Sequence, residues 1–127
     1  MALDLAANRI KTLPKNFNAL KFPYMSGLDL SSNAFDGFAY RALDLPNLQQ
    51  LLFRGQRDDN GYRCMKEWPT AVYAHHGLKV LYLGSNDIRR VVDYTLDKIR
   101  FGVELTDNPN ISIDLTTACP YICLLYT

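Results

Sequence analysis

The sequence has almost no net charge and no long apolar run. Fourteen Lys and Arg residues are balanced by thirteen Asp and Glu residues, which leaves a formal net charge of +1 at pH 7. No global field attracts nucleic acid or an anionic surface, so we expect no nucleic-acid partner. No apolar stretch approaches the roughly 18–20 residues that a membrane-spanning helix needs, so we expect no such segment. The first residues lack a basic region followed by an apolar one, and no signal peptide is visible.

Cysteine is scarce, and the sequence lacks catalytic signatures. Cys64, Cys119 and Cys123 give no clean disulfide count, and the last two either close a small loop or pack as thiols. These thiols, together with His75 and His76, lack zinc-finger spacing, so we expect no metal site. No signature of a serine hydrolase, a phosphate-binding loop, a zinc protease or a deaminase is present. The sequence therefore predicts neither a cofactor nor an enzyme.

What the sequence does contain is a frame of apolar residues that leads to a side-chain amide and recurs five times. In chain order the copies, called here the first to fifth repeats, are Leu3-x-Leu5-x-x-Asn8-x-Ile10, Met25-x-x-Leu28-x-Leu30-x-x-Asn33-x-Phe35, Leu48-x-x-Leu51-x-Phe53-x-x-Gln56, Leu78-x-x-Leu81-x-Leu83-x-x-Asn86-x-Ile88 and Val103-x-Leu105-x-x-Asn108. Successive amide positions lie 25, 23, 30 and 22 residues apart. Three of these spacings fall within the roughly 20–29 residues of a leucine-rich repeat.

The long spacing indicates an insertion in the third repeat. The run Met65-x-x-Trp68-Pro69 matches Ile10-x-x-Leu13-Pro14, so the residue equivalent to Asn8 is Arg63, seven positions after Gln56. We therefore expect an insertion of about seven residues, near 57–63.

The tip of this insertion allows two interpretations. The pair Asn60-Gly61 favours a tight hairpin, because both residues tolerate positive φ. The alternative is a calcium loop built from the oxygen atoms of Asp58, Asp59 and Asn60. The alternating ligands and final Glu of an EF-hand are missing, so we favour the hairpin.

The spacing within the frame predicts the fold. The two apolar residues of each Leu-x-Leu pair lie two apart, so on a strand both point into the core. A buried amide can satisfy the backbone groups of the turn that follows. We expect the five amides to stack in a ladder, each contributing roughly 1–3 kcal/mol; they are Asn8, Asn33, Gln56, Asn86 and Asn108.

The predicted fold class is therefore α/β. It is a right-handed leucine-rich repeat solenoid of about five repeats, with a parallel β-sheet on its concave face. The stretch Asn33-Ala34-Phe35-Asp36-Gly37-Phe38 resembles the Asn-x-Leu-x-Gly-x-Ile repeat of plant-type members. This resemblance implies a convex side that is mostly 3₁₀-helical or extended, with short helical turns. The whole chain, 1–127, is expected to be one domain, a fragment that lacks complete end caps.

Two further expectations concern the segments between strands. Ile10, Leu13, Phe17 and Leu20 follow the first strand and are expected to fill the interior of the first return. In the fourth repeat we expect Asp87, Arg89 and Arg90 to be solvated and paired locally.

Several stretches resemble one group of leucine-rich repeat proteins, the secreted and surface-anchored proteins of gut commensal bacteria. The stretches are 28–35, Gln56-Arg57-Asp58, Glu67-Trp68-Pro69, 84–89 and 107–113. The resemblance implies a non-catalytic role at the cell surface or outside the cell. The chain departs from the group at both ends, since it shows no export signal, no lipid-anchoring cysteine and no typical cap.

Outward side chains of the strands are expected to form the concave binding face. One row contains Asp4, Asp29, Leu52, Tyr82 and Glu104, and Gln50 and Arg54 lie beside Leu52. Tyr and Arg are enriched at binding hot spots, so we expect another protein to bind at the centre of this face. The alternatives are a glycan stacked on Tyr82, or self-association through the uncapped terminal repeats. A glycosidase pair of Asp4 and Asp29 is not expected, because the concave face does not offer the burial that such a pair needs.

Overall fold

The computed structural model describes residues 1–14, 17–18, 20–36, 45–67, 77–89, 102–112 and 122–123. His75, His76, Arg90 and Cys119 lie outside these residues. The expectations for the two histidines, for Arg90 and for a loop closed by Cys119 and Cys123 therefore fall outside the described structure.

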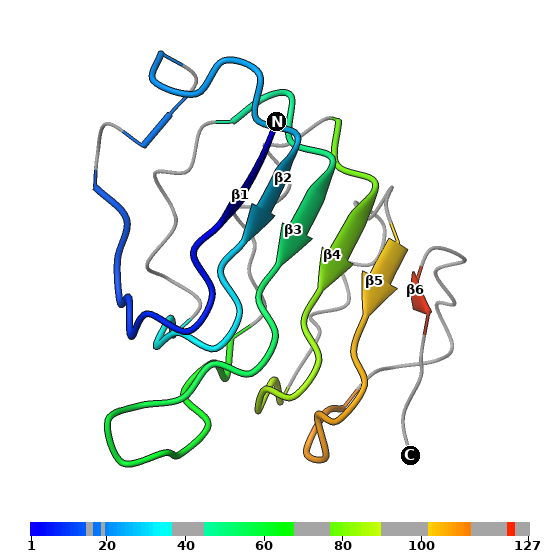
Figure 1. Ribbon diagram of the computed structural model, residues 1–127. Coiled ribbons are helices and arrows are strands. Elements are labelled where there is room, and N and C mark those ends of the chain that lie inside the picture. Colours follow the sequence, from blue (N-terminus) through cyan, green and yellow to red (C-terminus); the bar gives the residue numbers. More distant parts are fainter. Residues whose placement is uncertain are drawn as a thin grey trace.

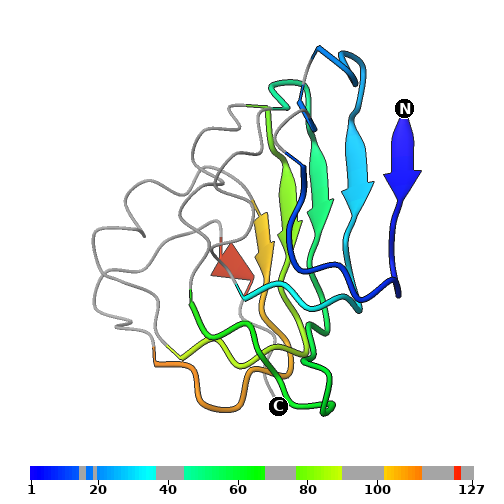
Figure 2. The ribbon, with the colours of Figure 1, turned by 90° about the vertical axis from the view of Figure 1, so that its left-hand side faces the viewer.

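Six short strands form one sheet in chain order. They are β1 (Ala2–Asp4), β2 (Gly27–Asp29), β3 (Gln50–Leu52), β4 (Val80–Tyr82), β5 (Gly102–Glu104) and β6 (Ile122–Cys123). Each strand pairs with the next in parallel, so the predicted parallel sheet is confirmed. Figure 1 shows the strands side by side from β1 to β6, and Figure 2 shows the sheet along one side of the molecule. Parallel neighbours separated by one full return form an open solenoid.

The first apolar residue of each Leu-x-Leu pair has the same register in successive strands. Leu3, Leu28, Leu51, Leu81 and Val103 pair across the sheet. The second residue of each pair follows the strand and is also buried from the second repeat onward. Together they form one continuous core, which is completed by an edge-on contact of two aromatic rings, with centroids 5.4 Å apart, between Phe35 and Phe53. No repeat could bury this apolar surface alone.

The first repeat is covered on one side only. Leu3, Leu5, Ile10 and Leu13 are partly buried, whereas their counterparts in the second, third and fourth repeats that the structure describes are buried. Asn8, the first amide of the ladder, is exposed. The face of β1 that points away from β2 is therefore an uncovered edge.

The described parts of the returning segments are turns and extended chain, with no helix among them. The expectation that Leu20 fills the first return is wrong, because 94% of its surface is exposed. The chain turns sharply here: the N–H groups of Lys21 and Phe22 both donate to the carbonyl of Asn18, and Leu20 sits at the tip. Phe22 occupies the interior instead, with its ring centroid 4.8 Å from that of Phe17.

Candidate functional site

The chain turns sharply after each of the first five strands, and these turns lie side by side beyond the C-terminal ends of the strands (Figure 1). This row of turns is called here the turn edge. The residue just before each ladder amide has a left-handed backbone, with φ between 55° and 66°; these residues are Ala7, Ser32, Gly55, Ser85 and Asp107. Only one of the five is glycine, although glycine is the residue that adopts this conformation without steric cost. The ladder amides must therefore hold strained turns in place.

The amides bond both within and between repeats. Asn33 accepts from the N–H groups of Asn8 and Ile10 in the first repeat at 2.9 Å, and donates to the carbonyls of Leu5 and Leu30 at 2.9 and 3.0 Å. The later three amides repeat this arrangement, each accepting a backbone N–H from the preceding repeat; they are Gln56, Asn86 and Asn108. All four are buried. Asn8 donates to two carbonyls of its own turn, and its side-chain oxygen accepts no hydrogen bond from the described residues.

The predicted concave row lies in register across the strands. Asp4, Asp29, Leu52, Tyr82 and Glu104 are successive partners. Asp4 is exposed, while the other four are partly buried, and Gln50 and Arg54 beside Leu52 are exposed. The centre of the face is therefore apolar and aromatic, with charged or polar side chains around it.

The three acids of this row are engaged with the backbone, which the sequence reasoning missed. A carboxylate oxygen of Asp4 accepts the N–H of Ala6, and one of Asp29 accepts the N–H of Ser31, both at 2.9 Å. Such contacts with the residue two positions on are a common preference of Asp in turns. The signal available in the sequence was the position of each acid, two residues before the turn that follows its strand. These acids stabilise strand ends and are less available to a ligand.

Glu104 is held more firmly, because it also bonds across to the fourth repeat. It accepts the N–H of Gly84 at 2.9 Å, bonds the N–H and hydroxyl of Thr106, and pairs with Arg54 at 3.4 Å. A Cβ on Gly84 would lie 2.6 Å from both carboxylate oxygens of Glu104 and 2.8 Å from Nε of Arg54. The missing side chain at Gly84 therefore makes room for this ion pair. The guanidinium remains accessible, since the side chain of Arg54 is 51% exposed while that of Glu104 is 16% exposed.

The insertion at 57–63 forms a hairpin, closed by an antiparallel bridge between Arg57 and Arg63. The N–H of Asp58 donates to the carbonyl of Tyr62, and the N–H of Gly61 donates to the carbonyl of Asp58. Of the two tip residues, Gly61 alone has positive φ, at 81°. The loop therefore has three residues and a glycine bulge, and the expected hairpin is confirmed, with positive φ at Gly61 and not at Asn60.

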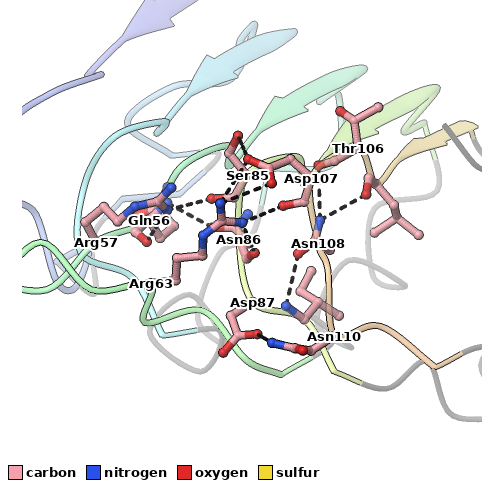
Figure 3. A network of polar contacts seen from close by, with 12 residues as sticks. Gln56, Arg57, Arg63, Ser85, Asn86, Asp87, Thr106, Asp107, Asn108 and Asn110 are labelled. Carbon is pink, nitrogen blue, oxygen red and sulfur yellow. Dashed lines mark hydrogen bonds and ion pairs between the residues drawn. The ribbon is translucent and has the colours of Figure 1, made fainter. Parts of the chain in front are cut away.

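The hairpin is anchored on the turn edge by its two arginines (Figure 3). Nη1 of Arg57 donates to the carbonyls of Gln56 and Ser85 at 2.9 and 2.6 Å. Nη1 of Arg63 donates to the carbonyls of Asn86 and Asp107 at 2.9 and 2.7 Å, and its Nη2 bonds the carboxylate of Asp107. Hydrogen bonds from Ser85 and Arg63 lower the pKa of Asp107. Each guanidinium thus bridges two backbone carbonyls: that of a ladder amide residue in one repeat, called here the ladder carbonyl, and that of the residue with a left-handed backbone in the next repeat, called here the left-handed carbonyl.

Asp87 is buried, which corrects the expectation that it is solvated. Its carboxylate accepts a hydrogen bond from the amide of Asn110 at 3.1 Å and pairs with Arg89 at 3.0 Å, so the expected local pairing with Arg89 is confirmed. Burial acts to raise the pKa of Asp87, but the hydrogen bonds from Asn110 and Arg89 outweigh it, and the pKa is lowered. The partner amide lies in the next repeat, 23 residues away.

A hollow of about 470 Å³ lies between the hairpin and the turn edge. It is lined by residues of the first three turns and of the hairpin: Arg9, Ser32, Asn33, Ala34, Gly55, Arg57, Asp58, Asp59 and Gly61. One oxygen of Asp58 accepts the N–H groups of Asn60 and Tyr62 and so holds the loop together. Among the described residues, no group of three or more His, Cys, Asp or Glu side chains is placed to hold a metal ion. Nor do they contain a helix long and apolar enough to span a bilayer.

The parallel sheet, its register and the stacked turns define the chain as a leucine-rich repeat solenoid. It resembles a leucine-rich repeat protein from Bacteroides thetaiotaomicron VPI-5482, with 37% identity and a TM-score of 0.75. It also resembles one from Bacteroides eggerthii DSM 20697, with 38% identity and a TM-score of 0.78. Each match covers 98% of this chain but only 15% and 21%, respectively, of those proteins. No family model and no curated protein matches the chain.

Proposed function

We propose that the chain is a non-catalytic protein-interaction module that binds through the centre of its concave face. The leucine-rich repeat fold supports a protein-binding role. The observation that carries this proposal is the register that places Leu52 beside Tyr82, with the half-exposed guanidinium of Arg54 next to them. An apolar and aromatic centre with a polar rim is the usual anatomy of a protein interface, and Tyr and Arg dominate hot spots. Asp4, Asp29 and Gln50 form the rim.

The test is a titration of a purified protein partner, identified by capture on the wild-type chain. We expect Tyr82→Ala to weaken binding by about 30-fold, the effect of a hot spot worth roughly 2 kcal/mol. Arg54→Gln removes the charged guanidinium but keeps a polar side chain, and it should weaken binding as well. Lys66→Ala is the matched control, because Lys66 is exposed and lies outside the strands. Wild-type affinity in both concave-face variants would refute the assignment.

The location proposed for this module is the cell surface or the extracellular space. The support is the resemblance to leucine-rich repeat proteins of two Bacteroides species. Fractionation of cells that express the full-length protein, with an antibody against this domain, tests the proposal. Recovery of the protein only from the cytoplasm would contradict it.

Glycan binding by the same face has less support from the geometry. The ring of Tyr82 is partly buried, and Glu104 is already engaged by Gly84, Thr106 and Arg54. A glycan array separates the two functions, because Tyr82→Ala should abolish any signal that depends on stacking.

Self-association is favoured by one separate observation, the uncovered edge at β1. The side-chain oxygen of Asn8 occupies the ladder position that, in the next four repeats, accepts a backbone N–H from the preceding repeat. Leu20 and Tyr24, both in the return after β1, are 94% and 80% exposed. A second copy of this chain could pair with β1, and sedimentation across a dilution series tests it. A Leu3→Lys variant should shift the chain to monomer, and a wild-type chain that is monomeric at every concentration would exclude such pairing.

A further inference from the structure

Along the turn edge, the same pair of backbone carbonyls recurs from one repeat to the next. Two of these pairs bind a guanidinium group of the chain itself. Arg57 bridges the ladder carbonyl of Gln56 and the left-handed carbonyl of Ser85. Arg63 bridges the equivalent carbonyls one repeat further on, those of Asn86 and Asp107. Both arginines come from the hairpin, and Figure 3 shows them side by side over the turns.

The same pair of carbonyls occurs one repeat earlier, at Asn33 and Gly55. Gly55 has φ 66°, close to the 56° of Ser85 and Asp107, so it occupies the same left-handed turn position as those two residues. The carbonyl of Asn33 accepts the N–H of Arg57 and keeps a second lone pair, just as that of Gln56 accepts both Cys64 N–H and a guanidinium. No guanidinium among the described residues donates to the carbonyls of Asn33 and Gly55.

This unfilled member of the series opens onto the hollow. Asn33 and Gly55 both line it, and so do two acidic residues of the hairpin, Asp58 and Asp59. At the filled site of Arg63 the guanidinium likewise combines two carbonyls with a carboxylate, that of Asp107. The residues that line the hollow therefore include the same kinds of acceptor, backbone carbonyls and carboxylates. Charge-assisted bonds of this kind are the strong ones, and the planar fork of arginine fits them.

Among the described residues, three cations lie near the hollow and bear on its charge. Arg57 lines it but is already bonded to two carbonyls, and Lys11 pairs with Asp59 at 3.4 Å with both side chains more than half exposed. Such an exposed pair is weak and can be displaced. Arg9 lines the hollow and makes no ion pair with the described residues, so it opposes an incoming cation by like charge.

We propose that the hollow binds the guanidinium group of an arginine side chain presented by a partner protein. The guanidinium lies between the carbonyls of Asn33 and Gly55 and pairs with Asp59, displacing Lys11. That the arginine belongs to a protein rests on the proposed function, whereas the affinity of the hollow for guanidinium does not. The two can therefore fail separately.

The test uses the full chain and the probe acetyl-arginine-methylamide, followed by nitrogen–proton NMR. We expect saturable shifts at the amides of Gly55 and Asp59. The citrulline analogue keeps the shape without the charge and should bind about tenfold more weakly. Absence of saturable shifts at these amides, or equal binding of the citrulline analogue, would overturn the proposal.

Variants complete the test. Asp59→Asn should weaken probe binding about threefold, and Arg9→Gln should strengthen it by a similar factor. Asp4→Asn removes an exposed carboxylate on the concave face and is the matched control. Tyr82→Ala should also leave probe binding unchanged, which separates this site from the concave face. Asp59 is about 70% exposed, so its variant should fold normally, and the NMR spectrum checks this directly. Unchanged affinity in Asp59→Asn would contradict the placement of the guanidinium.

Discussion

The cost of removing a ladder amide should depend on its position, and Asn86 and Asn8 make the sharpest comparison. The side-chain amide of Asn86 is fully buried and makes three hydrogen bonds with the described residues: it accepts the N–H of Gln56 at 2.8 Å and donates to the carbonyls of Phe53 and Leu83 at 2.9 and 2.8 Å. Asn8 is exposed and donates to two carbonyls of its own turn. Burial, rather than the number of bonds, separates the two.

The magnitudes follow from what each substitution leaves behind. In Asn86→Ala the buried N–H of Gln56 loses its acceptor, and two carbonyls each lose one donor. One stranded buried donor costs roughly 1–3 kcal/mol and each of the two lost bonds about 1 kcal/mol, so we expect a loss of about 3–5 kcal/mol. In Asn8→Ala water replaces the lost donor, and the carbonyl of Leu5 still accepts from Asn33. We expect a loss of at most about 0.5 kcal/mol there.

Urea unfolding followed by circular dichroism measures the difference. With a slope of about 2 kcal/mol per molar, the midpoint should fall by about 1.5–2.5 M for Asn86→Ala and hardly at all for Asn8→Ala. Asn86→Asp is a size-matched control that keeps the acceptor but loses the donors, and it should be destabilised as well. Equal midpoint shifts for Asn8→Ala and Asn86→Ala would refute the idea that buried, inter-repeat bonding gives the ladder its stability.

Three further outcomes follow from single contacts. Gly84→Ala should displace Glu104 and Arg54, because a Cβ would lie within 2.8 Å of both side chains. We expect a loss of about 1 kcal/mol in urea unfolding and altered NMR shifts at these residues, and an unchanged spectrum would contradict this. Gly55→Ala places a Cβ at φ 66° and should cost about 1 kcal/mol in the same assay; a stabilised variant would show that the turn relaxes. The folded-state pKa of Asp87 is lowered, so its contribution to the free energy of unfolding is present above the unfolded pKa of about 4 and is lost as the pH falls below it. Asp87→Asn should therefore flatten the acid side of a plot of unfolding free energy against pH, and parallel plots for the two proteins would rule this out.

The regular parts of the fold could be predicted from the sequence because they depend on local spacing. Apolar residues two apart, followed by an amide three positions later, indicate strand, core and turn in each of the five repeats. The parallel sheet and its register are as predicted. Repetition strengthens this inference, because each repeat must present the same edges to its neighbours.

The remainder depends on contacts between residues far apart in the chain. Asp87 is buried because Asn110, one repeat later, supplies a donor, and nothing near Asp87 in the sequence indicates this. Arg63 finds its carboxylate at Asp107, 44 residues away. Leu20 fits the apolar spacing of a return, but Phe22, two positions later, takes the interior place. Spacing alone could not choose between these two residues.

The hairpin has a consequence for how the molecule comes apart. Repeat proteins usually unravel from their ends, because each repeat touches only the ones beside it. Here Asp59 reaches Lys11 of the first repeat and Arg63 reaches Asp107 of the fifth, so one segment of the third repeat contacts repeats two positions away on each side. The exposed pair adds little, but the bonds of Arg63 must break before the fifth repeat can peel away. The fifth repeat and the hairpin should therefore unfold in one cooperative event, in contrast to the stepwise unfolding of a solenoid that lacks such contacts.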